Sequence, residues 1–238
     1  MACRFLILMP WGRVGSNLLM GLIQQAKESK KLNSEMFNQL NTPQQQLAWF
    51  RDFYEIGREQ SVILIGSKQS VLSICDIPAI ESLLHECHAR LIRMRRDDCL
   101  RTAISQMRAE QYAQETFAAS GKARWGLRVS DMPLGPSYID PDVLVRRIAI
   151  IEKHQKIMMS SFSGLDILDL EYEEINATLP NVYSRVTEFL GFQAKQYSVP
   201  FSKATPVDVR SVIVNLAEVK DAIRGGPYAA YLSEPRAD

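Results

Sequence analysis

Two short segments of the chain carry residues that could bind phosphate or sulfate groups. In the first, WGRVGSNLL at 11–19, Gly12 and Gly15 permit a tight backbone turn, and Ser16 and Asn17 open a helix. The free amides at the start of a helix point into such a turn and can bind an anion. The segment lacks both GxxxxGK[ST] and GxGxxG, so it indicates neither a P-loop NTPase nor a dinucleotide site. A plain glycine turn with a solvated Arg13 is the alternative interpretation.

The second segment, LIRMRRDDCLRTAIS at 91–105, concentrates arginines where a strand is expected to end. Arg93, Arg95 and Arg96 offer planar guanidinium groups that fit a phosphate. Ser105 follows about two turns into the next helix, and its hydroxyl could complete the site. A solvated basic surface paired with the neighbouring aspartates is the alternative. Taken separately, neither segment identifies a ligand.

The elements that must position these segments alternate between strands and helices. Apolar runs predict strands at 4–9, 61–66, 89–94 and 166–170, and a further one at 125–130. Apolar spacing and capping residues predict helices from 16, over 76–87, from about 98, and over 139–162, 179–190 and 214–223. This alternation predicts an α/β fold of three layers, with a central parallel sheet flanked by helices and ligands at the carboxyl ends of the strands.

Composition narrows the class of protein. The chain has 238 residues, of which 46% are hydrophobic and 23% charged, so we expect one globular domain over 1–238. The formal net charge of +1 provides no overall field that would favour nucleic acid or an anionic membrane. Without a long apolar stretch or a secretion signal, we expect a cytoplasmic protein with no transmembrane segment. The four cysteines lack metal-site spacing, so we expect no metal and no disulfide framework.

Together the two segments resemble the sulfotransferases that use 3′-phosphoadenosine 5′-phosphosulfate (PAPS), especially the bacterial branch that modifies trehalose and nodulation-factor sugars. The family's 5′-phosphosulfate loop usually reads like PRSGSTLL, and this chain has GRVGSNLL at 12–19. Asn17 replaces the usual Ser or Thr and can still donate a hydrogen bond. The resemblance implies a P-loop-like fold and a phosphosulfate loop made by Arg13, Val14, Gly15, Ser16 and Asn17.

The same resemblance implies a site for the 3′-phosphate of the nucleotide. The family pairs an arginine at a strand end with a serine one to two turns farther on, and Arg96 and Ser105 match this pattern. Their separation is one residue longer than in the common eukaryotic pattern. Arg93 and Arg95 therefore stay open as rival ligands of this phosphate.

Further matches follow the order that the family has along the chain. SEMFN at 34–38 resembles the segment with the catalytic glutamate, which would be Glu35, and ILIGSK at 63–68 and EYEEI at 171–175 resemble two further elements. KATP at 203–206 resembles a C-terminal loop that covers the cofactor, from about residue 195 onward, where Lys203 and Thr205 would touch the nucleotide. Asn215 and Glu218 resemble parts of the closing helix.

The resemblance implies transfer of a sulfuryl group from PAPS to a hydroxyl of a carbohydrate or other small-molecule acceptor, with PAP, adenosine 3′,5′-bisphosphate, as the product. Arg13 and the loop amides would stabilise the charge on the departing phosphate. Glu35 would take the acceptor's proton, which requires a partly desolvated carboxyl. Relatives in this branch can dimerise, so a homodimer is an open alternative to a monomer. A PAP-binding relative without catalysis and a small-molecule kinase are the other functions that the residues allow.

Overall fold

The computed structural model describes the chain except residues 1, 60–62, 126–133, 194–195, 200–207 and 234–238. The described residues form two compact units, the first made of 1–97 and 153–198 and the second of 98–152 and 199–238. Each unit is described by itself. A single domain over 1–238 therefore stays a prediction.

The strands are β1 (Cys3–Met9), β2 (Lys30–Ser34), β3 (Leu64–Ser70), β4 (Arg90–Arg95) and β5 (Ile167–Glu171). The helices are α1 (Ser16–Gln24), α2 (Pro43–Glu59), α3 (Ile77–Glu86), α4 (Cys99–Ser120), α5 (Pro141–Ser160), α6 (Tyr172–Leu190), α7 (Leu216–Ala222) and α8 (Ala229–Ser233), with short 3₁₀ helices at Met36–Gln39, Val71–Ser73 and Val209–Val212.

The first unit is built on a five-stranded sheet with the order β2-β3-β1-β4-β5. All its strand pairs are parallel, so the carboxyl ends of all five strands meet at one edge. From β1 the chain crosses over β3 to reach β2, whereas from β4 it runs the other way to β5. The neighbours β1 and β4 thus form the point at which the chain reverses direction, where open α/β sheets bind their ligands.

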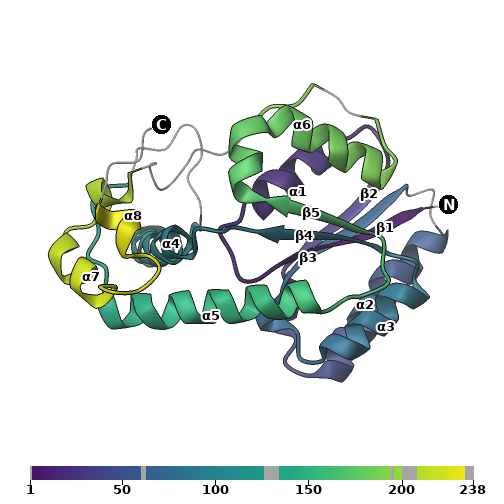
Figure 1. Cartoon of the computed structure of the whole chain (residues 1–238). Helices are drawn as coiled ribbons and strands as arrows, with labels where there is room; N and C mark the ends of the chain where they lie inside the picture. The colour runs from purple at the N-terminus through teal and green to yellow at the C-terminus, as the bar shows by residue number, and fades with distance from the viewer. Residues whose placement is uncertain (1, 60–62, 126–133, 194–195, 200–207, 234–238) are drawn as a thin grey trace. The chain divides into compact units, whose positions relative to one another are not determined.

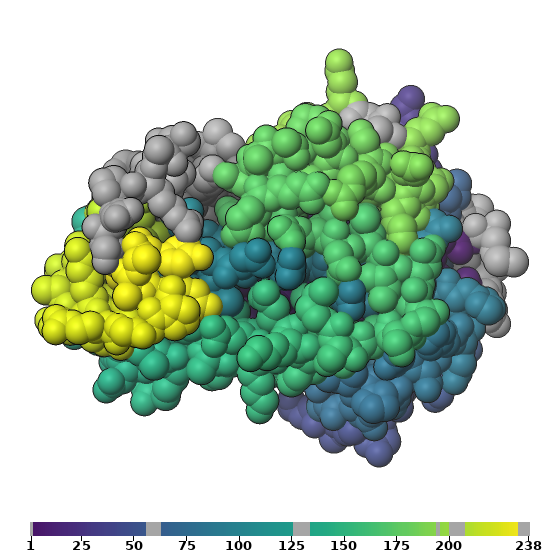
Figure 2. Space-filling view, in the orientation of Figure 1, coloured from purple at the N-terminus to yellow at the C-terminus, as the bar shows by residue number. Residues whose placement is uncertain are grey.

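Helices cover both faces of this sheet, which confirms the predicted α/β architecture (Figure 1). On one face Phe5 and Ile7 of β1 pack against α1 and α6, and on the other Leu6 and Leu8 pack against α2 and α3. All four side chains have no exposed surface. Because a fully buried apolar side chain of this size contributes about 1.5–3 kcal/mol, a strand buried on both faces holds the layers together. The space-filling view shows how little of the purple N-terminal segment remains visible beside the green residues of α6 (Figure 2).

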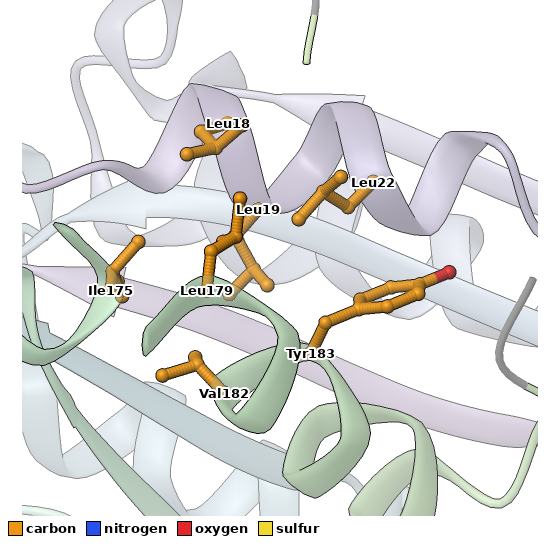
Figure 3. A pocket seen from close by; sticks show the side chains of 7 residues that line it. All are labelled: Leu18, Leu19, Leu22, Ile175, Leu179, Val182 and Tyr183. Carbon is orange, nitrogen blue, oxygen red and sulfur yellow. The ribbon is translucent and has the colours of Figure 1, made fainter. Parts of the chain in front are cut away.

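Apolar side chains join α1 to α6 above the sheet. Seven of them line a narrow crevice, shown in Figure 3: Leu18, Leu19, Leu22, Ile175, Leu179, Val182 and Tyr183. None of the lining residues is charged, and their packing holds α1 against the first part of α6. Its residues are therefore part of the packing that holds the loop before α1 in place.

The second unit consists of helices. Arg147 of α5 makes two hydrogen bonds to Glu110 of α4, at 2.6 and 2.9 Å. Asn215, which precedes α7, accepts a hydrogen bond from the backbone amide of Ile139 at 3.0 Å and donates to its carbonyl at 2.9 Å. The side chain of Asn215 thus ties the residues before α5 to α7. No helix among the described residues is both long and apolar enough to cross a membrane.

The predicted strands and helices are largely confirmed, with shifts at their ends. The strand predicted at 61–66 runs from Leu64 to Ser70, and most of the segment predicted as a strand at 125–130 lies outside the described residues. The helix predicted at 179–190 is the second part of α6, which has non-helical angles at Thr178 and ends at Gly191 in a left-handed conformation. The sequence analysis did not predict β2 or α2.

Candidate functional site

The loop between β1 and α1 turns tightly at the carboxyl edge of the sheet. Gly15 has a φ of 82°, which only glycine adopts without strain, and its carbonyl accepts the first helical hydrogen bond from Leu19 at 3.0 Å. A Cβ added at Gly15 would lie 3.3 Å from the ring of Tyr172, so glycine also permits the close approach of α6. The loop therefore brings the amino end of α1 to the edge where the strands end.

Two predicted loop residues turn their side chains away from the loop. Val14 is 1% exposed and belongs to the core between the sheet and α1. The hydroxyl of Ser16 lies 3.1 Å from the sulfur of Met9 and is buried. Only the backbone amides of these two residues are thus left as candidate anion donors.

Arg13 lies in this loop in a left-handed conformation, with a φ of 67°. Burial lowers the pKa of its guanidinium, Tyr172 opposes this shift, and the positive charge of Arg96 adds to it. The pKa of Arg13 thus responds to the charge of Arg96. Positive charge near the amino end of a helix favours an anion.

Arg96 follows β4, the strand adjacent to β1, and is 5% exposed. Its guanidinium carbon lies 4.2 Å from the centre of the Tyr172 ring, and its Nε lies 3.8 Å from a carboxylate oxygen of Glu173. The position of Arg96 near the β1–α1 loop follows from the strand order, because β1 and β4 are neighbouring parallel strands. Arg96 comes directly after β4, and Arg13 lies in the loop that follows β1.

The two rival arginines make ion pairs with the next strand. Arg93 binds both carboxylate oxygens of Asp169, at 2.7 and 2.8 Å, and Arg95 pairs with Glu171. In each pair the two residues face each other across β4 and β5. Among the three arginines, Arg96 is the one that lies over the ring of Tyr172, which in turn lies against Gly15 of the β1–α1 loop.

Glu35 forms a second cluster at the same sheet edge. Its carboxylate oxygen Oε1 lies 2.6 Å from the Nζ of Lys68, and Lys68 also donates a hydrogen bond to the side-chain oxygen of Asn17. The side chain of Lys68 is 2% exposed. One buried ammonium group therefore connects the predicted base to the first turn of α1.

The backbone also fixes Glu35. Its amide donates to the carbonyl of Lys68 at 2.7 Å, its Oε2 accepts from Asn38 at 3.2 Å, and its φ is 57°. A residue other than glycine rarely holds such a φ unless its surroundings impose it, and strain of this kind gathers at functional sites. The side chain is 36% exposed, so it is partly desolvated, and its carboxylate is paired with the ammonium group of Lys68.

No protein-family model matches the sequence, and no curated protein sequence is significantly similar to it. Among solved structures, one from Alicyclobacillus acidocaldarius is 14% identical with a TM-score of 0.49, over 97% of this chain and 99% of that chain. Another, mouse SULT7A1 in complex with PAP, is 13% identical with a TM-score of 0.42, over 99% of this chain and 68% of that chain. Both are sulfotransferases. Identity this low assigns no role to any residue of the present chain.

The remaining predicted sulfotransferase residues lie elsewhere. Ser105 belongs to α4 in the second unit, whereas Arg96 belongs to the first, so their pairing stays a prediction. Lys203 and Thr205 lie outside the described residues. In the part of the chain that the structure describes, His, Cys, Asp and Glu form no group of three or more that could hold a metal ion.

Lys68, like Tyr172, is a residue of this site that the sequence analysis did not single out. The signal was present in ILIGSK, because a lysine directly after a buried apolar run has no place in a sheet core unless it is paired. Its partners could not be predicted, since they come from segments 33 and 51 residues away along the chain.

Proposed function

We propose that the chain transfers a sulfuryl group from PAPS to a hydroxyl of a carbohydrate or other small-molecule acceptor. One observation supports the proposal: the guanidinium of Arg96 lies over the ring of Tyr172, and the same ring lies against Gly15 of the 13–17 loop. A nucleotide with anionic groups on both its 5′ and 3′ positions needs two such sets of donors. The chemistry of the donors present in the loop fits such a ligand.

Both backbone amides and arginine side chains would bind the nucleotide. The amides at the start of α1 and the guanidinium of Arg13 would bind the 5′ end, and Arg96 would bind the 3′-phosphate. Lys203 and Thr205 are proposed to contribute from the C-terminal region, and Ser105 from α4. When bound, PAPS supplies the sulfuryl group to be transferred.

The chain's own contribution to the transfer is electrostatic. As the bond between the sulfur and the bridging oxygen of the 5′-phosphate breaks, negative charge grows on that oxygen, and Arg13 with the helix amides is suited to stabilise it. Such donors, fixed before the reaction, need no reorganisation during it. Glu35 would accept the proton of the acceptor hydroxyl as the new sulfur–oxygen bond forms. Lys68 would orient the carboxylate through the ion pair between them.

The test is to incubate the purified chain with radiolabelled PAPS and pools of hydroxyl-bearing acceptors, sugars first, and to measure sulfated product. Wild type is expected to form product, and Glu35→Gln, which keeps the size but removes the base, is expected to lose most of the turnover. Removing a positioned general base typically costs about 10²–10⁴-fold in rate.

Two results would replace the proposal with another function. Tight binding of PAP, measured by calorimetry, without product from any acceptor pool would make the chain a nucleotide-binding module. Magnesium-dependent consumption of ATP would make it a kinase instead. Equal turnover by wild type and Glu35→Gln would remove Glu35 from the role of base and leave the transfer reaction standing.

A further inference from the structure

Three consecutive residues at the junction of β5 and α6 contact the segment that carries Arg96. Glu171 pairs with Arg95, the ring of Tyr172 lies under the guanidinium of Arg96, and Glu173 reaches both Arg96 and the backbone amide of Asp97, at 3.8 and 3.5 Å. The junction thus fixes the end of β4 residue by residue. Tyr172 is the central contact of the three.

The same ring lies against the β1–α1 loop. Its Cδ2 would be 3.3 Å from a Cβ at Gly15, and Tyr172 raises the pKa of Arg13, against the effect of burial. Tyr172 therefore contacts both the 13–17 loop and Arg96, the two parts of the candidate nucleotide site. The spacing between the loop and Arg96 depends on the width and position of this one ring.

A guanidinium on an aromatic face is held by the ring's negative quadrupole and by stacking of the two planes. The stacked group keeps its N–H bonds in its own plane, so they point outward from its edge, the direction from which a phosphate would approach. Arg96 is buried, which strengthens the contact, because less water competes for the cation. An aliphatic side chain at position 172 would fill the space without holding the plane.

We infer that Tyr172 is a positioning residue that sets nucleotide specificity, by holding Arg96 at a fixed place beside the 13–17 loop. This inference rests on the proposed function and deepens it. With the ring in place, a nucleotide that carries phosphates at both the 5′ and 3′ positions is preferred over one with a 5′-phosphate alone. Without the ring, the loop still binds a 5′-phosphate, but Arg96 no longer meets the 3′-phosphate in a fixed orientation.

The experiment is calorimetry of the full chain with PAP and, separately, with adenosine 5′-monophosphate. Tyr172→Leu is expected to reduce the affinity ratio of the two ligands roughly tenfold, with the affinity for the monophosphate nearly unchanged. Tyr172→Phe retains the ring and is expected to lose less. Tyr197→Leu is the matched control, because it removes another tyrosine of the first unit, one that packs edge-on against Tyr183 at 4.9 Å, and it should leave the ratio as in wild type.

An equal loss of affinity for both ligands in Tyr172→Leu, or no loss for either, would overturn the inference, since a purely structural role predicts one of these results. If Tyr172→Leu does not fold, Tyr172→Met decides, because methionine fills more of the space and still has no ring to hold the guanidinium. The same drop in the ratio supports the inference, and an unchanged ratio overturns it. If the wild type forms sulfated product and prefers PAP while Tyr172→Leu keeps the same affinity ratio, the inference about Tyr172 fails and the proposed function stands. Wild type that binds no PAP would overturn both.

Discussion

Lys68 holds its ammonium nitrogen 2.6 Å from a carboxylate oxygen of Glu35, and the same ammonium donates to Asn17 in the first turn of α1. The predicted base and the predicted phosphosulfate loop are therefore joined by one buried cation. Because a charge without a partner is costly to bury, the cluster holds together only while all three side chains keep their places. A change at Lys68 should thus be felt in the proposed reaction more than in the affinity for the nucleotide.

Lys68→Met is expected to lower kcat for sulfuryl transfer roughly tenfold or more, because the carboxylate of Glu35 loses the contact that orients it. The affinity for PAP should change much less, since Lys68 contacts Glu35 and Asn17, whereas Arg13 and Arg96 are the side chains proposed to bind the nucleotide. Steady-state kinetics on one acceptor, with calorimetry for PAP, measures both quantities.

Lys31→Met provides the control for this change. Lys31 lies on the neighbouring strand β2, with its ammonium over the ring of Phe53 at 4.9 Å, so the substitution is the same but lies outside the cluster. It should leave kcat close to that of wild type. Turnover by Lys68→Met within about twofold of wild type would contradict the coupling between Lys68 and Glu35.

Arg13→Ala should cost about 10²-fold or more in kcat, the size of effect seen when a fixed donor to a developing negative charge is removed. The proposed reason is that charge grows on the departing phosphate next to this guanidinium. Arg51→Ala, on the exposed surface of α2, serves as the control and should not affect turnover. A rise in KM with an unchanged kcat would instead make Arg13 a residue that binds the nucleotide equally well before and during the reaction.

The left-handed backbone of Arg13 predicts a conflict between stability and activity. Since its φ is 67°, an L-residue is strained there and glycine is not. Arg13→Gly should therefore be more stable than Arg13→Ala by about 1 kcal/mol, while both lose the guanidinium and the activity. Urea denaturation of the two variants measures the difference. If the alanine variant is at least as stable as the glycine variant, the loop does not store strain at this position.

The strands of the central sheet could be predicted because a strand buried on both faces is a continuous apolar run, as in RFLILM and ARLIRM. The edge strand β2 reads KKLNS and has the polar composition of an exposed segment, so its pairing with β3 gives no local signal. The expected approach of Arg96 to the β1–α1 loop rests on the order of strands, which the alternation of elements restricts. The contacts of Tyr172 with Arg96 and with Gly15 could not be predicted, since they depend on how α6 docks against the loop.

Side-chain directions at the site were the least predictable part. Ser16 is the first residue of α1, a position that suggests a hydroxyl aimed at the loop, yet its hydroxyl points to Met9 in the core. Ser105, Lys203 and Thr205 depend on the second unit and on residues outside the described part, so their roles stay predictions. Local patterns specify which face of an element is apolar, whereas the partners of a polar side chain come from distant parts of the chain.

Tyr54 on α2 gives a prediction about stability at high pH. Its hydroxyl is buried and donates to the carbonyl of Phe5 in β1 at 2.6 Å, and burial raises the pKa of Tyr54 above its ordinary value. The unfolded chain releases this proton near pH ~10, whereas the folded chain keeps it to higher pH. The contribution of the buried hydroxyl is therefore complete below pH ~10 and is lost as the pH rises further, by about 1.4 kcal/mol for each unit.

Tyr54→Phe isolates this contribution, because it removes the ionisable group and retains the ring. Near neutral pH the wild type should be the more stable by about 1 kcal/mol, the typical net value of one buried hydrogen bond. Above pH ~10 the difference between the two should shrink and then change sign, since only the wild type is destabilised by ionisation of the unfolded tyrosine. Urea unfolding of both proteins across this range measures the difference directly and cancels the lysines that titrate in both. A difference that stays constant from neutral to alkaline pH would mean that the hydroxyl of Tyr54 ionises as easily in the folded chain as in the unfolded one.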